Sequence, residues 1–181
     1  RGTEILIKLK DEAKEYADGH RLRSIIGKYS DHISLPIRMP ELDDDNKKKD
    51  SWETVNKGSA LWARKKSDIT QGEYNTFYQN LSYDSEPPLA TIHNHVEGNL
   101  EYISLFFIPA RAPFDLWNRE QRHGVKLYVR RVFIADDAEH LMPNYLRFVR
   151  GVVDSADLPL HVSREFLQHN KAIDKIRAAS V

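Results

Sequence analysis

Cysteine is absent from the 181-residue chain. Its absence excludes disulfides, thiolate zinc sites, iron–sulfur clusters and every cysteine nucleophile. It also fits a reducing compartment, so we expect a cytoplasmic protein. A net charge is missing too, since 27 Lys and Arg residues balance 27 Asp and Glu residues. Because no whole-molecule field attracts polyanions, we expect neither nucleic acid nor a membrane as a partner.

Long hydrophobic runs are also missing. Apolar stretches such as residues 103–110 are far shorter than the roughly 20 residues that a membrane-spanning helix needs. No signal-peptide pattern opens the chain, which begins without Met and stops inside a helical pattern at residues 170–181. These ends predict a piece of a longer protein. The hydrophobic fraction of 40% is nevertheless large enough for a folded core.

The first part of the chain carries mixed periodicities. Apolar residues alternate with lysines over residues 5–9, which predicts a strand with one buried face. Residues 22–29 have the apolar spacing of a helix, and residues 33–39 are predicted as a second strand. The charged residues 41–50 are predicted as a solvated loop. The three aspartates at positions 43–45 lack the glycine and distal glutamate of a calcium loop, so we expect no metal site.

The next part of the chain begins with a helix signal. Thr70 and Glu73 match the capping box, which predicts a helix start followed by a stripe of core aromatic residues. Residues 90–96 and 100–108 alternate on either side of a short polar turn and are predicted to form a hairpin.

The last part of the chain has further strand patterns. We expect one strand at residues 125–134, another at residues 149–153, and a helix from Ser163 onward with Ile173 and Ile176 on one side. Helices interleaved with a mixed sheet predict an α/β layered domain with a short C-terminal helical extension.

Short motifs for self-contained chemistry are lacking. The chain has no phosphate-binding loop, no dinucleotide fingerprint, no nucleophile elbow and no zinc helix. His93 and His95 would share one face of a strand, where cross-strand hydrogen bonding explains them better than nuclease chemistry does. Arg130 and Arg131, placed in a strand, would point to opposite faces. A nucleic-acid interface there is a weaker alternative that predicts steep salt dependence.

Arg164 is the best candidate for chemistry. Ser163 can cap a helix, so Arg164 would project from the first helical turn, where an always-charged fork and free amides suit a phosphate. The alternative is a structural Arg164 that pairs with Glu165 or Asp157. The pattern by itself leaves both possibilities open.

Several long segments, taken in order, resemble one family. They are LRSIIGKYSDHI (22–33), IPARAPFD (108–115), KLYVRRVFI (126–134), and DLPL with SRE between residues 157 and 165. This order resembles the 90-kDa heat-shock protein chaperones, from about residue 2 to residue 177. SWE, ALW and DLWNR, beginning at residues 51, 60 and 115, are similar to the bacterial type of the family.

The resemblance implies a place in a larger protein. It implies a layered α/β/α fold, the second-domain architecture of the ATPases that include gyrase, heat-shock chaperones and MutL. Residues 1–155 would form the large middle subdomain, and residues 156–181 the catalytic loop and the start of a helical linker. The N-terminal nucleotide-binding domain and the C-terminal dimerisation domain would lie outside this chain. The full-length protein would be a homodimer.

The resemblance also implies a catalytic role. Arg164 would reach the γ-phosphate of ATP, which is held with magnesium by the N-terminal domain of the same polypeptide, and Gln168 would support that arrangement. The full-length protein would then be an ATPase, whereas this chain alone would hold no cofactor and would be inactive.

Contacts with other proteins are implied as well. Phe114 and Phe133 would contact unfolded client proteins or the N-terminal domain, and we expect them to be exposed; the alternative is that either belongs to the core. Two departures from the family pattern are Ser85, where relatives often have a client-contacting aromatic residue, and His161, which replaces an asparagine. The alternative function is a non-catalytic protein-binding module in which Arg164 is structural.

Overall fold

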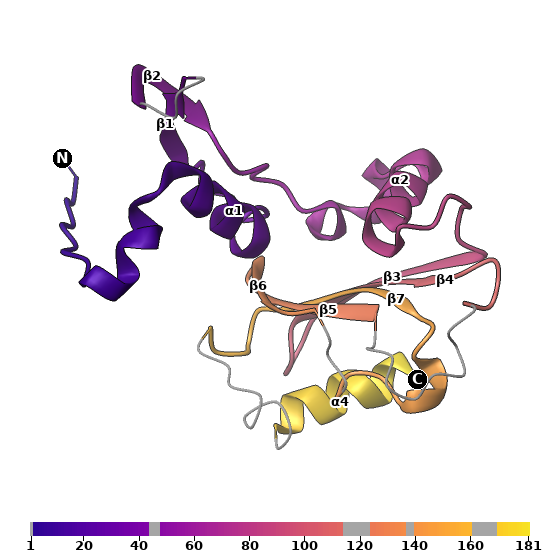
Figure 1. The fold of residues 1–181 in the computed structure, drawn as a ribbon. Helices are drawn as coiled ribbons and strands as arrows, with labels where there is room; N and C mark the ends of the chain where they lie inside the picture. The colour runs from indigo at the N-terminus through magenta and orange to yellow at the C-terminus, as the bar shows by residue number, and fades with distance from the viewer. Residues whose placement is uncertain (1, 44–47, 114–123, 137–139, 161–169) are drawn as a thin grey trace. The chain divides into compact units, whose positions relative to one another are not determined.

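The computed structural model describes residues 2–43, 48–113, 124–136, 140–160 and 170–181 (Figure 1). The chain forms two compact units, Arg1–Gly58 and Ser59–Val181. Their boundary lies far from residue 155, where the sequence analysis divides the chain by function.

The first unit contains a helix and a small hairpin. Its elements are η1 (Asp11–Ala17), α1 (Gly19–Tyr29), β1 (Arg38–Leu42) and β2 (Lys48–Thr54), and the two strands are antiparallel. Asp18 caps α1 by accepting a hydrogen bond from the amide of Arg21 at 2.7 Å. The helix expected at residues 22–29 is therefore confirmed, and it begins one turn earlier.

Three expectations for this unit need correction. Residues 5–9 form no strand, and Ile5, Leu6 and Ile7 are exposed, because none of the described strands pairs with them. The second strand begins at Arg38 and ends at Leu42, later than residues 33–39. The charged stretch 41–50 is not all loop, because the pairing of Leu42 with Lys48 extends the hairpin into it.

Arg23 of α1 binds the hairpin. Its Nε and Nη2 atoms donate to Glu53 Oε1 at 3.1 and 2.6 Å, and Nη2 also donates to the Pro40 carbonyl at 2.6 Å. One half-buried guanidinium thus contacts both strands, which helical periodicity could not predict.

The second unit is built on a five-stranded mixed sheet. Its strands are β3 (Ala90–Val96), β4 (Tyr102–Ile108), β5 (Gly124–Val129), β6 (Val132–Ala135) and β7 (Arg150–Ser155), in the spatial order β3-β4-β7-β5-β6. Among the described strand pairs of this sheet, only β5–β7 is parallel. The predicted hairpin of residues 90–108 and the strand at 149–153 are confirmed.

Helices cover both faces of this sheet. Figure 1 shows α2 (Gln71–Ser82) on one face and α4 (Lys171–Ser180) on the other. The described part of the unit also contains the short 3-10 turns η2 (Leu61–Ala63), η3 (Lys66–Asp68) and η4 (Asn144–Leu146). The predicted layered α/β fold with a C-terminal helix is confirmed.

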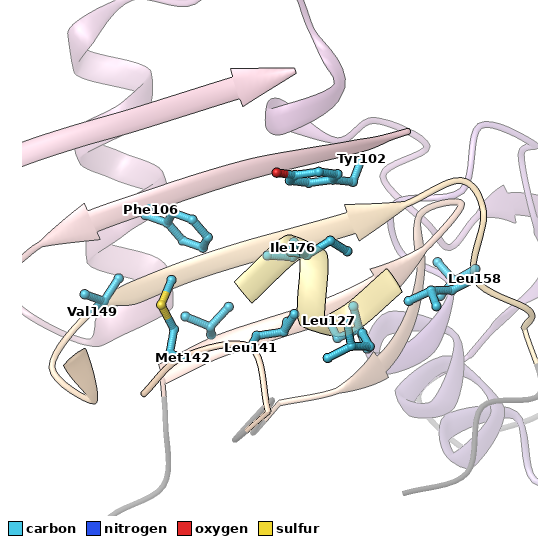
Figure 2. Close-up of a cluster of buried hydrophobic side chains, with 12 residues drawn as sticks. Tyr102, Phe106, Leu127, Leu141, Met142, Val149, Leu158 and Ile176 are labelled. Atoms are coloured by element: carbon cyan, nitrogen blue, oxygen red, sulfur yellow. The ribbon is translucent and has the colours of Figure 1, made fainter. Parts of the chain in front are cut away.

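Alternation along the strands divides the core into two clusters. The α4 cluster contains Ile173 and Ile176 of that helix, and the α2 cluster contains Tyr74 and Tyr78 of that helix. In β4, Phe106 packs with the α4 cluster, whereas Leu105 and Phe107 pack with the α2 cluster. Ile173 and Ile176 place α4 in the first cluster, part of which Figure 2 shows. The C-terminal helix is therefore a layer of the domain.

Gly151 allows the two central strands to approach closely. A Cβ atom at this position would overlap the carbonyl oxygen of Leu105 and touch Phe106 in β4. Any larger residue would push β7 away from β4. The pairing of β7 with β4 therefore requires glycine at position 151.

The capping box at the start of α2 is confirmed in atomic detail. The Glu73 amide donates to Thr70 Oγ1 at 3.3 Å, and the Thr70 amide donates to Glu73 Oε2 at 2.8 Å. Arg64 Nη1 donates to the other Glu73 oxygen at 2.6 Å. These bonds, the one from Arg64 first among them, lower the pKa of Glu73 from 4.5 to about 2.

Glu73 predicts a pH-dependent stability. Because its pKa is lower in the folded state, its contribution is present above about pH 4.5 and is lost as the pH falls toward 2. Urea unfolding of the wild type and Glu73→Gln should therefore show a difference in free energy that shrinks over this interval. Arg64→Gln should reproduce part of the loss, because Thr70 still binds the carboxylate. A pH-independent difference between wild type and Glu73→Gln would contradict the prediction.

Candidate functional site

A polar cluster lies where β7 ends. The β5–β6 turn is fixed to this end by three hydrogen bonds: the Arg130 amide to the Ser155 carbonyl at 3.1 Å, Arg130 Nε to the Ala156 carbonyl at 3.0 Å, and the Arg131 amide to Asp154 Oδ1 at 3.1 Å. These bonds join two neighbouring strand connections at one end of the sheet.

The arginine pair corrects a sequence prediction. Residues 125–134 form a tight hairpin instead of one strand, and Arg130 and Arg131 have φ values of 49° and 67° at its tip. Such a turn favours glycine or asparagine, because other residues are strained at positive φ. The bonds to the end of β7 compensate for that strain. The arginines therefore do not alternate across a strand, as their positions in the sequence suggested.

Asp154 continues the polar cluster into the core. Its Oδ2 atom accepts a hydrogen bond from the indole Nε1–H of Trp62 at 2.8 Å, and both residues are buried. Trp62 also packs against Tyr128, with ring centroids 4.7 Å apart. Residues distant in sequence thus share one buried carboxylate.

His93 extends the same chain of hydrogen bonds. Its Nε2 lies 2.9 Å from the Trp62 carbonyl, which can only accept, so Nε2 carries the proton and Nδ1 accepts from the Tyr74 hydroxyl at 2.7 Å. Burial lowers the pKa of His93 and favours this neutral form. The expected hydrogen bonding of His93 is present, but its partners come from α2 and η2 and not from a neighbouring strand. His95 is exposed, 3.8 Å from Glu97.

The chain beyond β7 is held by a second set of bonds. Ser155 Oγ accepts from the amides of Asp157 and Leu158, both at 3.3 Å. Asp157 Oδ2 accepts from the Glu101 amide at 2.6 Å, and the Glu101 carbonyl accepts from the Ala156 amide at 3.1 Å. The approach to residues 161–169 is thereby fixed to the start of β4.

The chain after residues 161–169 is fixed as well. Asn170 caps α4 by accepting from the Ala172 amide at 2.7 Å. Ile173 and Ile176 belong to the same buried cluster as Leu158, and Figure 2 shows Leu158 and Ile176 in it. Both flanks of the segment therefore rest on one core.

Most of the predicted site residues belong to segments that the structure does not describe. Arg164, Gln168 and Phe114 lie outside the described residues, as does His161. Asp157, the alternative ion-pair partner of Arg164, already binds the Glu101 amide through one oxygen.

The position of Phe133 corrects a sequence prediction. It was expected to be exposed, but it is 8% exposed and its ring meets Tyr128 edge to face at 5.6 Å. The register of β6 directs this side chain into the α2 cluster, so it belongs to the core and not to the surface.

Two exposed apolar residues were missed by the sequence analysis. Tyr83 is 95% exposed at the C-cap of α2 with a φ of 59°, and Leu89 is 72% exposed just before β3. Ser85 lies between them and is also exposed. The sequence could have predicted the exposure of Tyr83, because this residue lies off the buried stripe of α2 and shortly before Pro87.

Metal-binding clusters and membrane-spanning helices are both absent from the described residues. No group of three or more His, Cys, Asp or Glu side chains there could hold a metal ion. Asp44 and Asp45 of the acidic run are outside that part of the chain. None of its helices has the length and apolar character needed to cross a bilayer.

Comparison with known proteins gives the class of this chain. The family model described as Hsp90 protein matches residues 40–181, which is most of the chain. The chain therefore belongs to the Hsp90 protein family, as the resemblance predicted.

The similarity also extends to a particular type. The chain is 58% identical over 190 residues to chaperone protein HtpG of Idiomarina loihiensis, covering 99% of this chain and 30% of that protein. It is 60% identical over 186 residues to chaperone protein HtpG of Nitrosomonas europaea, covering 100% of this chain and 29% of that protein. The chain is thus similar over its whole length to bacterial HtpG chaperones and spans about 30% of the length of these relatives.

The buried indole–carboxylate bond predicts a stability effect. Trp62→Phe keeps an aromatic ring but removes the donor to Asp154, so it should lower the free energy of unfolding by about 1–3 kcal/mol. Urea denaturation followed by circular dichroism measures this loss. Trp52→Phe is the matched control, because Trp52 is mostly exposed and should cost less than about 0.5 kcal/mol. Equal effects of the two variants would contradict the assignment.

Proposed function

We propose that this chain is the middle-domain segment of an ATP-dependent chaperone. In this proposal Arg164 reaches the γ-phosphate of ATP held in the N-terminal domain of the same polypeptide, and Gln168 supports it. The observation that carries the proposal is the Hsp90 match over residues 40–181, which includes the SRE motif at residues 163–165. The HtpG relatives, named as chaperones, support it further.

The chemistry suits an arginine delivered from a second domain. The guanidinium is planar and always charged, so it can neutralise negative charge on a transferring phosphoryl group. Bound ATP and magnesium would supply the reacting phosphate from the other domain. Since the chain has no phosphate-binding loop, it would bind no nucleotide alone and would be inactive without that domain.

The remaining context follows from the same proposal. The partners are the N-terminal ATP-binding domain and unfolded client proteins, and the full-length protein is a cytoplasmic homodimer. Residues 1–155 form the large subdomain and residues 156–181 the catalytic loop with its following helix. The bonds of Ser155 and the packing of Ile173 support a loop that is mounted on the sheet of that subdomain.

A client-binding surface is a second role that a specific observation favours. Tyr83 and Leu89 expose apolar side chains close together in sequence, on either side of exposed Ser85. Tyr83 also occupies a left-handed backbone conformation that disfavours its large side chain. We infer that these two residues contact clients, in place of the aromatic residue that relatives often have at the position of Ser85.

The catalytic role predicts a large loss on removing the guanidinium. In the full-length chaperone that contains this segment, Arg164→Ala should lower ATP turnover by about 10² because one preorganised charge is lost. A steady-state ATPase assay measures it. Arg177→Ala is the matched control, since Arg177 is an exposed arginine of α4. Turnover that is unchanged in Arg164→Ala would exclude the proposed role, and Arg164 would then be structural.

The client role predicts a loss of binding without a loss of turnover. The double substitution Tyr83→Ser with Leu89→Ser should weaken binding of a chemically unfolded protein by at least about tenfold, because two exposed apolar contacts are removed. Fluorescence anisotropy of a labelled unfolded protein measures it. Tyr145→Ser, at another exposed tyrosine, is the control. Equal affinities for the double variant and the wild type would rule out this surface.

A further inference from the structure

The segment between β7 and residues 161–169 is bound more closely than a connecting loop requires. We propose that Ser155 and Asp157 are positioning residues for the arginine that follows them. This inference rests on the proposed function of Arg164, and it assigns to two further residues the task of fixing where the loop begins.

Ser155 makes the first contact. Its side chain is fully buried, at 0% exposed, and its Oγ atom accepts the amides of both Asp157 and Leu158. A side-chain oxygen that caps the next residues in this way turns the chain as soon as the strand ends. Without the hydroxyl, the buried Leu158 amide would lose its bond, so the turn is specified by this one atom.

Asp157 makes the second contact. Its carboxylate accepts the Glu101 amide at 2.6 Å, while the Glu101 carbonyl accepts the Ala156 amide at 3.1 Å. These two bonds form a reciprocal clamp between the chain after β7 and the residue before β4. The short distance and the charged acceptor make the Asp157 bond the stronger of the two.

Arg130 closes the clamp from the other side. Its Nε donates to the Ala156 carbonyl, while the Ala156 amide donates to the Glu101 carbonyl. Both backbone polar groups of Ala156 are therefore hydrogen-bonded to neighbouring parts of the sheet. Leu158 then enters the buried cluster that also holds Ile173 of α4. Both flanks of residues 161–169 are thus set by one core, and Asp157 acts on the first flank together with Ser155 and Arg130.

This arrangement predicts a specific kinetic signature. In the proposed function ATP is bound by another domain, so releasing the clamp should leave the KM for ATP unchanged. The turnover number should fall, because misplacing a group that acts on the reacting phosphate by about 1 Å can cost up to 10²-fold in rate. Loss of the clamp acts only through Arg164.

The experiment measures ATP turnover and KM of the full-length chaperone carrying this segment. Asp157→Ala should lower kcat about tenfold with KM unchanged, a loss within the range that misplacement produces. Asp157→Asn should remain within about twofold of the wild type, because its amide oxygen can still accept the Glu101 amide. Ser155→Ala should resemble Asp157→Ala. Ser104→Ala removes a buried hydroxyl from the middle of β4 and is the matched control.

The same substitutions in an Arg164→Ala background separate the two proposals. If Arg164→Ala lowers turnover and Asp157→Ala lowers it no further, the positioning role is supported. If Arg164→Ala has no effect, the proposed function itself fails. If Arg164→Ala lowers turnover but the two losses multiply, or if Asp157→Ala raises KM with kcat unchanged, the positioning role is overturned. Asp157 is exposed, so its variants decide the question even where Ser155→Ala does not fold.

Discussion

The buried carboxylate of Asp154 is the constraint on which the second unit depends. A polar group removed from water must be hydrogen-bonded, and the Trp62 indole and the Arg131 amide donate to the two oxygens of Asp154. One donor comes from the segment before α2 and the other from the turn between β5 and β6. Satisfying this one group therefore fixes the register of elements that approach the sheet from different parts of the chain, and His93 adds a further bond through the Trp62 carbonyl.

The central strand β7 links this constraint to the end of the sheet that precedes residues 161–169. Gly151 lets β7 lie close to β4 at one end, and Asp154 and Ser155 collect hydrogen bonds at the other. The strand separates two apolar clusters, one under each helix layer. A rigid core thus ends in a dense set of polar contacts immediately before the segment that contains Arg164. This order suits a domain that presents a charged side chain to a ligand held elsewhere.

In the proposed function, the nucleotide is held by another domain of the same polypeptide. A catalytic group delivered to it would need a stable platform and a defined mounting, and the described contacts of this unit would supply both. The exposed Tyr83 and Leu89 come from the helix end and the connection that precede β3, away in sequence from residues 155–158. Client contact and phosphate contact would then be made by different parts of one domain.

The sequence by itself determined the local elements and the family. The capping box of Thr70 and Glu73, the hairpin of β3 and β4, and the apolar face of α4 follow from spacing alone, because their stabilising contacts lie within a few residues or one repeat. Tertiary structure decided the rest. The alternation at residues 5–9 forms no strand because strands need partners, and Arg130 and Arg131 form a turn because distant carbonyl and carboxylate groups compensate for their strain. Phe133 is buried and Asp157 clamps Glu101 for the same physical reason: long-range partners, which no local pattern encodes, set the side-chain environment.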